Sequence, residues 1–288
     1  MQSIKPIYEF LLWPNCRNNC KFCFLKKEQD NTDQEKISAL SSALSFIESD
    51  RFKKGSHVLI LGGEVFDSPS IHQELNKFFS IIVSKMCSNH IDLLYINTNL
   101  IYKKLDALEF LIQQLDSNSL LNKLKFTSSY DLDGRFNKHT EQLMLNNLQY
   151  LTNKYARLNT AINIILTQKV CNYIVEDKLN IKEFMDTYKV YVNLIPYIVY
   201  DASIAADRNL VFKALSHAEK QCPGYLYSYI KNFDLPQKKL LHKYNKATKQ
   251  FEYCSCDDLS CGHSENFKKY STSGTCFICD IKELFLNE

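Results

Sequence analysis

The sequence is poor in the features that mark fibrous, secreted or membrane-embedded proteins. Only seven glycines and six prolines occur in 288 residues, so the chain is neither collagen-like nor of low complexity. No apolar run reaches the roughly 18 residues that a membrane-spanning helix needs, and the N-terminus has no signal-peptide pattern. Neither charge dominates, because 35 basic residues stand against 32 acidic ones. We therefore expect a globular, cytoplasmic protein without a membrane partner.

Cysteine, by contrast, is abundant. There are eleven cysteines, an odd number, and most of them are tightly grouped, which favours metal ligation in a reducing compartment over disulfides. The first group comprises Cys16, Cys20 and Cys23, and the second comprises Cys254, Cys256, Cys261, Cys276 and Cys279. The scattered residues Cys87, Cys171 and Cys222 are interpreted as buried thiols.

Short β-rich segments alternate with segments of helical period, which is typical of a parallel sheet with crossover helices. Strands are predicted at 7–13, 57–61, 93–97, 123–130, 160–167 and 190–198, and helices at 34–48, 70–87, 102–115, 137–154, 180–187 and 202–220. Six such units are too few for a closed eight-stranded barrel. The predicted fold is therefore α/β, an open partial (β/α)6 TIM-like barrel over residues 1–220. Residues 221–288 are predicted to form a small Cys-rich, metal-binding C-terminal extension.

The strongest chemical signal is the segment CRNNCKFC, which follows the first predicted strand. Its thiolates, Cys16, Cys20 and Cys23, can converge on one iron–sulfur cluster, and the missing fourth ligand leaves one iron open to a substrate or cofactor. Zinc is the alternative, but zinc sites more often use paired C-x2-C motifs, and no nearby histidine or cysteine completes a local site.

At these residues the sequence resembles the radical S-adenosylmethionine (SAM) superfamily, whose signature is C-x3-C-x2-C after the first strand of a partial (β/α)6 barrel. The resemblance covers roughly residues 5–220. It implies that Cys16, Cys20 and Cys23 hold a [4Fe-4S] cluster and that SAM is the cofactor. Phe22, the aromatic residue before the third cysteine, is expected near the adenine.

A second match is the segment LILGGEVF at the end of the second predicted strand. A Gly-Gly-Glu tripeptide alone is more often a plain turn. The resemblance assigns it to the methionine amino group of SAM, with Gly62 and Gly63 allowing close backbone approach and Glu64 supplying the acceptor.

Polar residues also follow the later strands, where an open barrel presents its functional loops. The resemblance implies that such positions bind the ribose hydroxyls and carboxylate of SAM, and they are Asn97, Thr98, Ser128, Ser129, Asp131 and Asn163. Asp131 and Arg135 could form a polar clamp on cofactor or substrate, or belong to a solvated loop that turns at Gly134. Ile195, with its neighbours Leu194 and Pro196, is expected to edge the adenine.

The resemblance implies an enzyme that cleaves SAM reductively. An external one-electron reductant supplies the electron, and the resulting 5′-deoxyadenosyl radical abstracts hydrogen from an unidentified substrate: a peptide, a nucleotide or a nucleic acid. The cofactor carries the chemistry, and the protein orients it.

The C-terminal cysteines predict a second metal centre, either structural zinc or an auxiliary iron–sulfur cluster. Between the barrel and these cysteines, lysines alternate with aromatic residues, a composition that could bind a nucleic acid but is more often a solvated face. They are Lys231, Lys238, Lys239, Lys243, Lys246 and Lys249 with Tyr229, Phe233 and Tyr244. The alternative function is therefore a non-catalytic, zinc-stabilised nucleic-acid-binding module.

Overall fold

The structure of the chain is a computed structural model. It describes residues 5–14, 16, 18, 20, 31–132, 135–196, 206–226, 228, 239–245 and 250–253, and only the backbone of the last two ranges. Several predictions therefore lie outside the described residues: those for Phe22, Cys23, Gly134, Cys254, Cys256, Cys261, Cys276 and Cys279. Most of the lysine-rich segment lies outside them as well.

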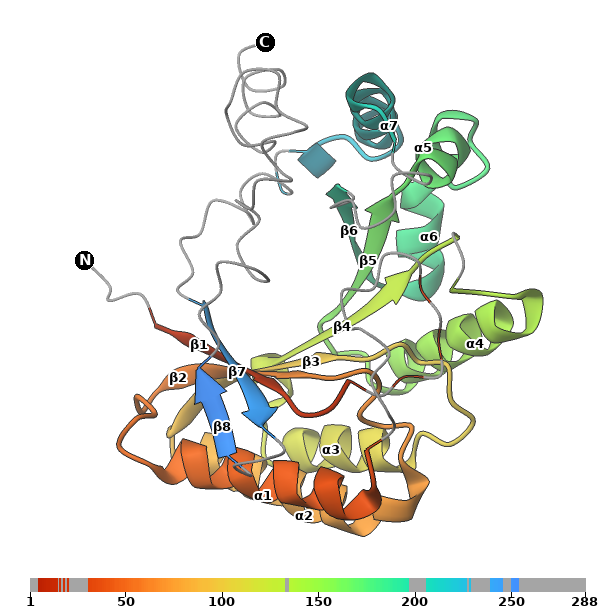
Figure 1. The fold of residues 1–288 in the computed structure, drawn as a ribbon. Coiled ribbons are helices and arrows are strands. Elements are labelled where there is room, and N and C mark those ends of the chain that lie inside the picture. The colour runs from red at the N-terminus through yellow and green to blue at the C-terminus, as the bar shows by residue number, and fades with distance from the viewer. Residues whose placement is uncertain are drawn as a thin grey trace.

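One curved sheet organises the described part of the chain (Figure 1). Its strands are β1 (Ile7–Leu11), β2 (Ser56–Leu61), β3 (Ile91–Asn97), β4 (Leu124–Tyr130), β5 (Thr160–Leu166), β6 (Tyr191–Pro196), β7 (Lys239–Asn245) and β8 (Gln250–Tyr253). Their order is β6-β5-β4-β3-β2-β1-β7-β8, and every neighbouring pair is parallel except β7 and β8. Because β6 and β8 are the two ends of this order, the sheet is open. The predicted partial barrel is confirmed.

The helices lie on the convex side of the sheet, with α1 to α3 below β1 to β3 and α4 to α7 beside β4 to β6 in Figure 1. They are α1 (Asp33–Glu48), α2 (His72–Cys87), α3 (Asp106–Ser117), α4 (Lys138–Lys154), α5 (Gln168–Val175), α6 (Ile181–Tyr188) and α7 (Arg208–Gln221), with 3-10 turns at Pro69–Ile71 and Leu121–Lys123. Capping residues determine where two of these helices begin. Thr32 and Glu35 form a capping box at α1, and Asn137 caps α4 through the backbone N–H groups of His139 and Thr140.

Alternation along the strands divides the sheet into a buried and a concave face. In β4 and β5 every second residue is buried against the helices, including Phe126, Ile162 and Ile164. The residues between them are less buried and belong to the concave face. Polar residues at these positions can therefore face a ligand without entering the core.

Three elements were not predicted: α5, β7 and β8. α5 follows β5 after Thr167 alone, with no glycine or proline to mark the change. β7 and β8 lie beyond residue 220 and extend the barrel sheet past β1, so the sheet continues into the region predicted as an extension. Among the described residues, no helix combines the length and the hydropathy needed to span a membrane.

Candidate active site

The candidate site lies where β1, β2 and β3 end. Three segments meet at this edge of the sheet: the residues after β1, the Gly-Gly-Glu turn after β2, and the turn at 98–102 after β3. The first two are joined by the backbone, because Gly63 donates its N–H to the carbonyl of Trp13 at 2.8 Å. Gly62 packs against the same carbonyl, which lies 3.1 Å from where a Cβ atom would stand. These glycines thus hold the turn after β2 against the end of the first segment, and their approach to SAM stays a prediction.

Glu64 joins the second and third segments. Its side chain is buried, and its carboxylate accepts three hydrogen bonds: from the Thr98 hydroxyl at 2.8 Å, from the Asn99 backbone N–H at 2.6 Å and from the Phe66 backbone N–H at 3.2 Å. Thr98 also hydrogen-bonds the hydroxyl of Tyr102 at 3.0 Å. Both Glu64 oxygens are therefore engaged by the protein itself.

Burial dominates the electrostatics of this network. Desolvation raises the pKa of Glu64 to about 7, against the opposing effect of the bonds from Asn99, Thr98 and Phe66. Burial, followed by the nearby charge of Glu64, raises the pKa of Tyr102 well above its usual value. The site therefore holds a carboxyl group that titrates near neutral pH beside a phenol that stays protonated.

Asn99 connects this network to the predicted cluster loop. Its side-chain Nδ2 lies 3.6 Å from the Sγ atom of Cys16, and the backbone N–H of Asn18 donates to the same sulfur at 3.4 Å. Burial raises the pKa of the Cys16 thiol, whereas these two donors lower it. Two N–H donors aimed at one sulfur are the surroundings that a metal-bound thiolate uses.

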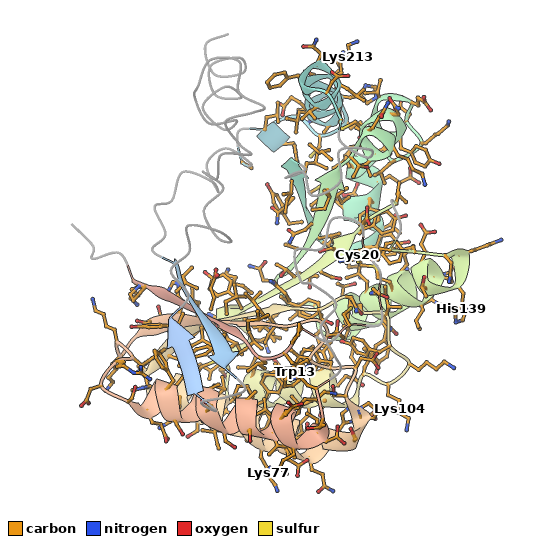
Figure 2. The ribbon with its side chains drawn as sticks, in the orientation of Figure 1. Trp13, Cys20, Lys77, Lys104, His139 and Lys213 are labelled. Carbon is orange, nitrogen blue, oxygen red and sulfur yellow. The ribbon has the colours of Figure 1, made fainter. Side chains whose placement is uncertain are left out.

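The second cysteine has a donor of a different kind. Arg135 donates its Nε–H to the Sγ atom of Cys20 at 3.2 Å and its Nη1–H to the carbonyl of Ser129 at 2.9 Å. The carbonyl at the end of β4 thus orients the guanidinium toward the sulfur. In Figure 2, Cys20 is drawn near the end of β4, whereas Lys77 of α2 and His139 of α4 project outward. The clamp of Arg135 with Asp131 stays a prediction.

The remaining predicted residues lie either on the concave face of the sheet or buried away from it. Ser129 and Asn163 are register partners on the concave face, and Asn163 accepts a hydrogen bond from Asn193 of β6 at 3.0 Å. Asn97, which is bonded by the Thr127 hydroxyl, and Ile195 belong to the same face.

Ser128 and Asp131 are buried and are not part of this group on the concave face. Ser128 is paired with the fully buried Ile162, so alternation turns it toward the helices, away from Ser129. Asp131 is fully buried directly after β4.

Sequence reasoning missed Asn99, Tyr102 and Asn193. A signal for Asn99 existed, since it is the second asparagine of the N-T-N run whose first two residues were selected. The helix predicted at 102–115 includes Tyr102, but α3 begins only at Asp106. Asn193 continues the Ser129 and Asn163 row, which becomes visible only once the strand register is known.

Comparison with known proteins supports the fold. No protein-family model and no curated protein matches the chain. Two solved structures of anSMEcpe with bound AdoMet match it with TM-scores of 0.54 and 0.51, at 14% and 16% identity, over 81% of this chain and 63% and 61% of theirs. SuiB from Streptococcus suis, bound to S-adenosylmethionine, matches with a TM-score of 0.48 at 15% identity, over 86% of this chain and 52% of its own.

The likeness to the two anSMEcpe structures, at 14% and 16% identity, supports the fold alone. The chain spans less than two thirds of the length of each of these SAM-bound proteins. The fold is the one that the resemblance to the radical SAM superfamily predicted.

Proposed function

We propose that the chain is a radical SAM enzyme. The observation that carries the proposal is the link from the Gly-Gly-Glu turn through Glu64 and Asn99 to the sulfur of Cys16. The two motifs, each selected from the sequence for its chemistry, are separate in the chain and are joined by one hydrogen-bonded network through Cys16 and Glu64. A fold shared with SAM-bound proteins supports the same conclusion.

In this proposal Cys16, Cys20 and Cys23 hold a [4Fe-4S] cluster. The donor set fits, because the two described sulfurs receive N–H donors from Asn18, Asn99 and Arg135. When bound, the reduced cluster and SAM supply the 5′-deoxyadenosyl radical that abstracts hydrogen from a substrate. The protein's own part is to hold the sulfurs, orient SAM and keep water from the reacting groups.

The proposed SAM site uses the turn after β2 and the concave face. Gly62 and Gly63 bring backbone close to the methionine end of SAM, and Glu64, whose oxygens already accept three bonds, holds that turn in place. Asn97, Ser129 and Asn163 on the concave face are proposed for the ribose and carboxylate, and Phe22 and Ile195 for the adenine. A one-electron reductant and an unidentified substrate complete the reaction.

We also propose a second metal centre, zinc or an iron–sulfur cluster, at the C-terminal cysteines Cys254, Cys256, Cys261, Cys276 and Cys279. Clustered thiolates are the preferred ligands of both. Iron and zinc analysis of the whole chain and of a variant with all five cysteines changed to serine tests it, and unchanged metal content in that variant refutes it.

The enzyme proposal is tested with anaerobically reconstituted protein by electron paramagnetic resonance, before and after addition of SAM. We expect a reduced [4Fe-4S] signal that changes with SAM, together with release of 5′-deoxyadenosine. Cys20→Ala should abolish both, whereas the matched variant Cys87→Ala, at a cysteine of α2 that was predicted to be buried but is exposed, should keep both. Stoichiometric zinc without iron would refute the proposal and favour the zinc-stabilised binding module.

A further inference from the structure

Asn99 is held by three hydrogen bonds that fix both its backbone and its side chain. Its backbone N–H donates to Glu64 at 2.6 Å, and its side-chain Oδ1 accepts from the Ile101 backbone N–H at 2.6 Å. Since a backbone N–H can only donate, the atom facing Ile101 must be the oxygen of the amide. The NH2 group is thereby left pointing toward Cys16, 3.6 Å from its sulfur.

The turn that carries Asn99 has an uncommon backbone. Leu100 has a φ of +58° and is fully buried, although a leucine in this left-handed region is sterically disfavoured. Asn147 of α4 holds the turn from outside, because its side-chain NH2 donates to the carbonyls of Leu100 and Tyr102, both at 2.9 Å. A disfavoured conformation that the surrounding structure maintains indicates a functional constraint.

From this geometry we infer that Asn99 is a positioning residue that tunes the reduction potential of the cluster at Cys16. An N–H donor stabilises a thiolate more strongly as negative charge on it increases, and reduction adds one electron to the cluster. The bond from Asn99 therefore favours the reduced state and makes the cluster easier to reduce. Glu64 contributes by holding the Asn99 backbone. The inference rests on the proposed function, because it requires an iron–sulfur cluster at Cys16.

The test is a redox titration of the reconstituted protein without SAM, followed by electron paramagnetic resonance. Asn99→Ser removes the donor to Cys16 but keeps a hydroxyl that can accept from Ile101. Asn99→Asp is a second variant of nearly the same shape. It keeps an oxygen that accepts from the Ile101 N–H and replaces the NH2 group that donates to Cys16. The matched controls are Asn153→Ser and Asn153→Asp in α4, where the side chain is exposed.

We expect the ratio of reduced to oxidised cluster at a fixed potential to fall about tenfold in both Asn99 variants, which lowers the midpoint by about 59 mV for one electron. The Asn153 variants should stay near wild type. Full iron content with unchanged midpoints in both Asn99 variants would overturn the inference and leave the proposed cluster intact. A wild-type chain that binds no iron would overturn the proposed function and the inference together.

Discussion

Glu64→Gln separates the charge of the buried side chain from its shape. Glutamine has nearly the same volume, and its oxygen can still accept from Thr98 and Phe66. Its NH2 group would face the Asn99 N–H, however, and two donors cannot satisfy each other. At low pH the variant should therefore be less stable than wild type by about 1 to 3 kcal/mol, the usual penalty for an unsatisfied buried group.

The difference between the two proteins should depend on pH. The pKa of Glu64 is raised from 4.5 to about 7 in the folded state, so between these values the folded chain binds the proton more tightly than the unfolded chain. The free energy of unfolding must then fall as pH rises through this window. A pKa difference of about 2.5 corresponds to about 3 kcal/mol of lost stability, at about 1.4 kcal/mol per unit.

The assay is urea denaturation of the cluster-free protein at several pH values between about 4.5 and 8. Wild type should lose about 3 kcal/mol relative to Glu64→Gln across that range, so that the disadvantage of the variant shrinks or disappears above pH 7. Glu183→Gln, an exposed glutamate of α6, controls for the substitution itself. Parallel curves for wild type and Glu64→Gln would refute the reasoning, because the buried carboxyl would then have the same pKa in both states.

Two further predictions concern the backbone around the site. Gly62→Ala places a Cβ atom 3.0 Å from Val65 Cγ2 and 3.1 Å from the Trp13 carbonyl oxygen, so we expect a loss of about 1 to 3 kcal/mol in urea denaturation and weaker SAM binding by calorimetry. Asn147→Leu leaves two carbonyls of the turn after β3 without their donor, and it should lower stability by about 1 to 3 kcal/mol; an unchanged denaturation midpoint would contradict it.

The sequence predicted the barrel well where the hydrophobic periodicity agreed with the glycines and prolines at the element boundaries. All six barrel strands were located to within a few residues, because buried β-rich runs alternate with helical segments. α5 was missed because its eight residues follow β5 with no glycine or proline between the two elements. β7 was missed for a different reason: Lys239–Asn245 joins the sheet through backbone bonds to β1, which its lysine-rich composition does not reveal.

At the site, the sequence predicted which residues carry the chemistry better than it predicted which residues contact one another. Cys16 could be selected because the spacing of the three cysteines is specific, and the Gly-Gly-Glu turn because the family resemblance assigns it a role. The role of Glu64 as an acceptor for SAM stays a prediction. The bonds that its oxygens accept from neighbouring chain segments could not be predicted, because they depend on burial that the sequence does not display. Ser128 and Ser129 could not be told apart until the strand register assigned them to opposite faces.

The network around Glu64 also explains how elements far from the cysteines can affect them. Asn147 of α4 fixes the carbonyl of Leu100, the turn at Leu100 places Asn99, and Asn99 contacts Cys16. Each link is a directional hydrogen bond or a fixed backbone conformation, so a change at Asn147 can reach the sulfur without an intervening ligand contact. Packed interiors transmit such shifts because they have little room to absorb them. Through Asn147, α4 is therefore linked to the surroundings of Cys16.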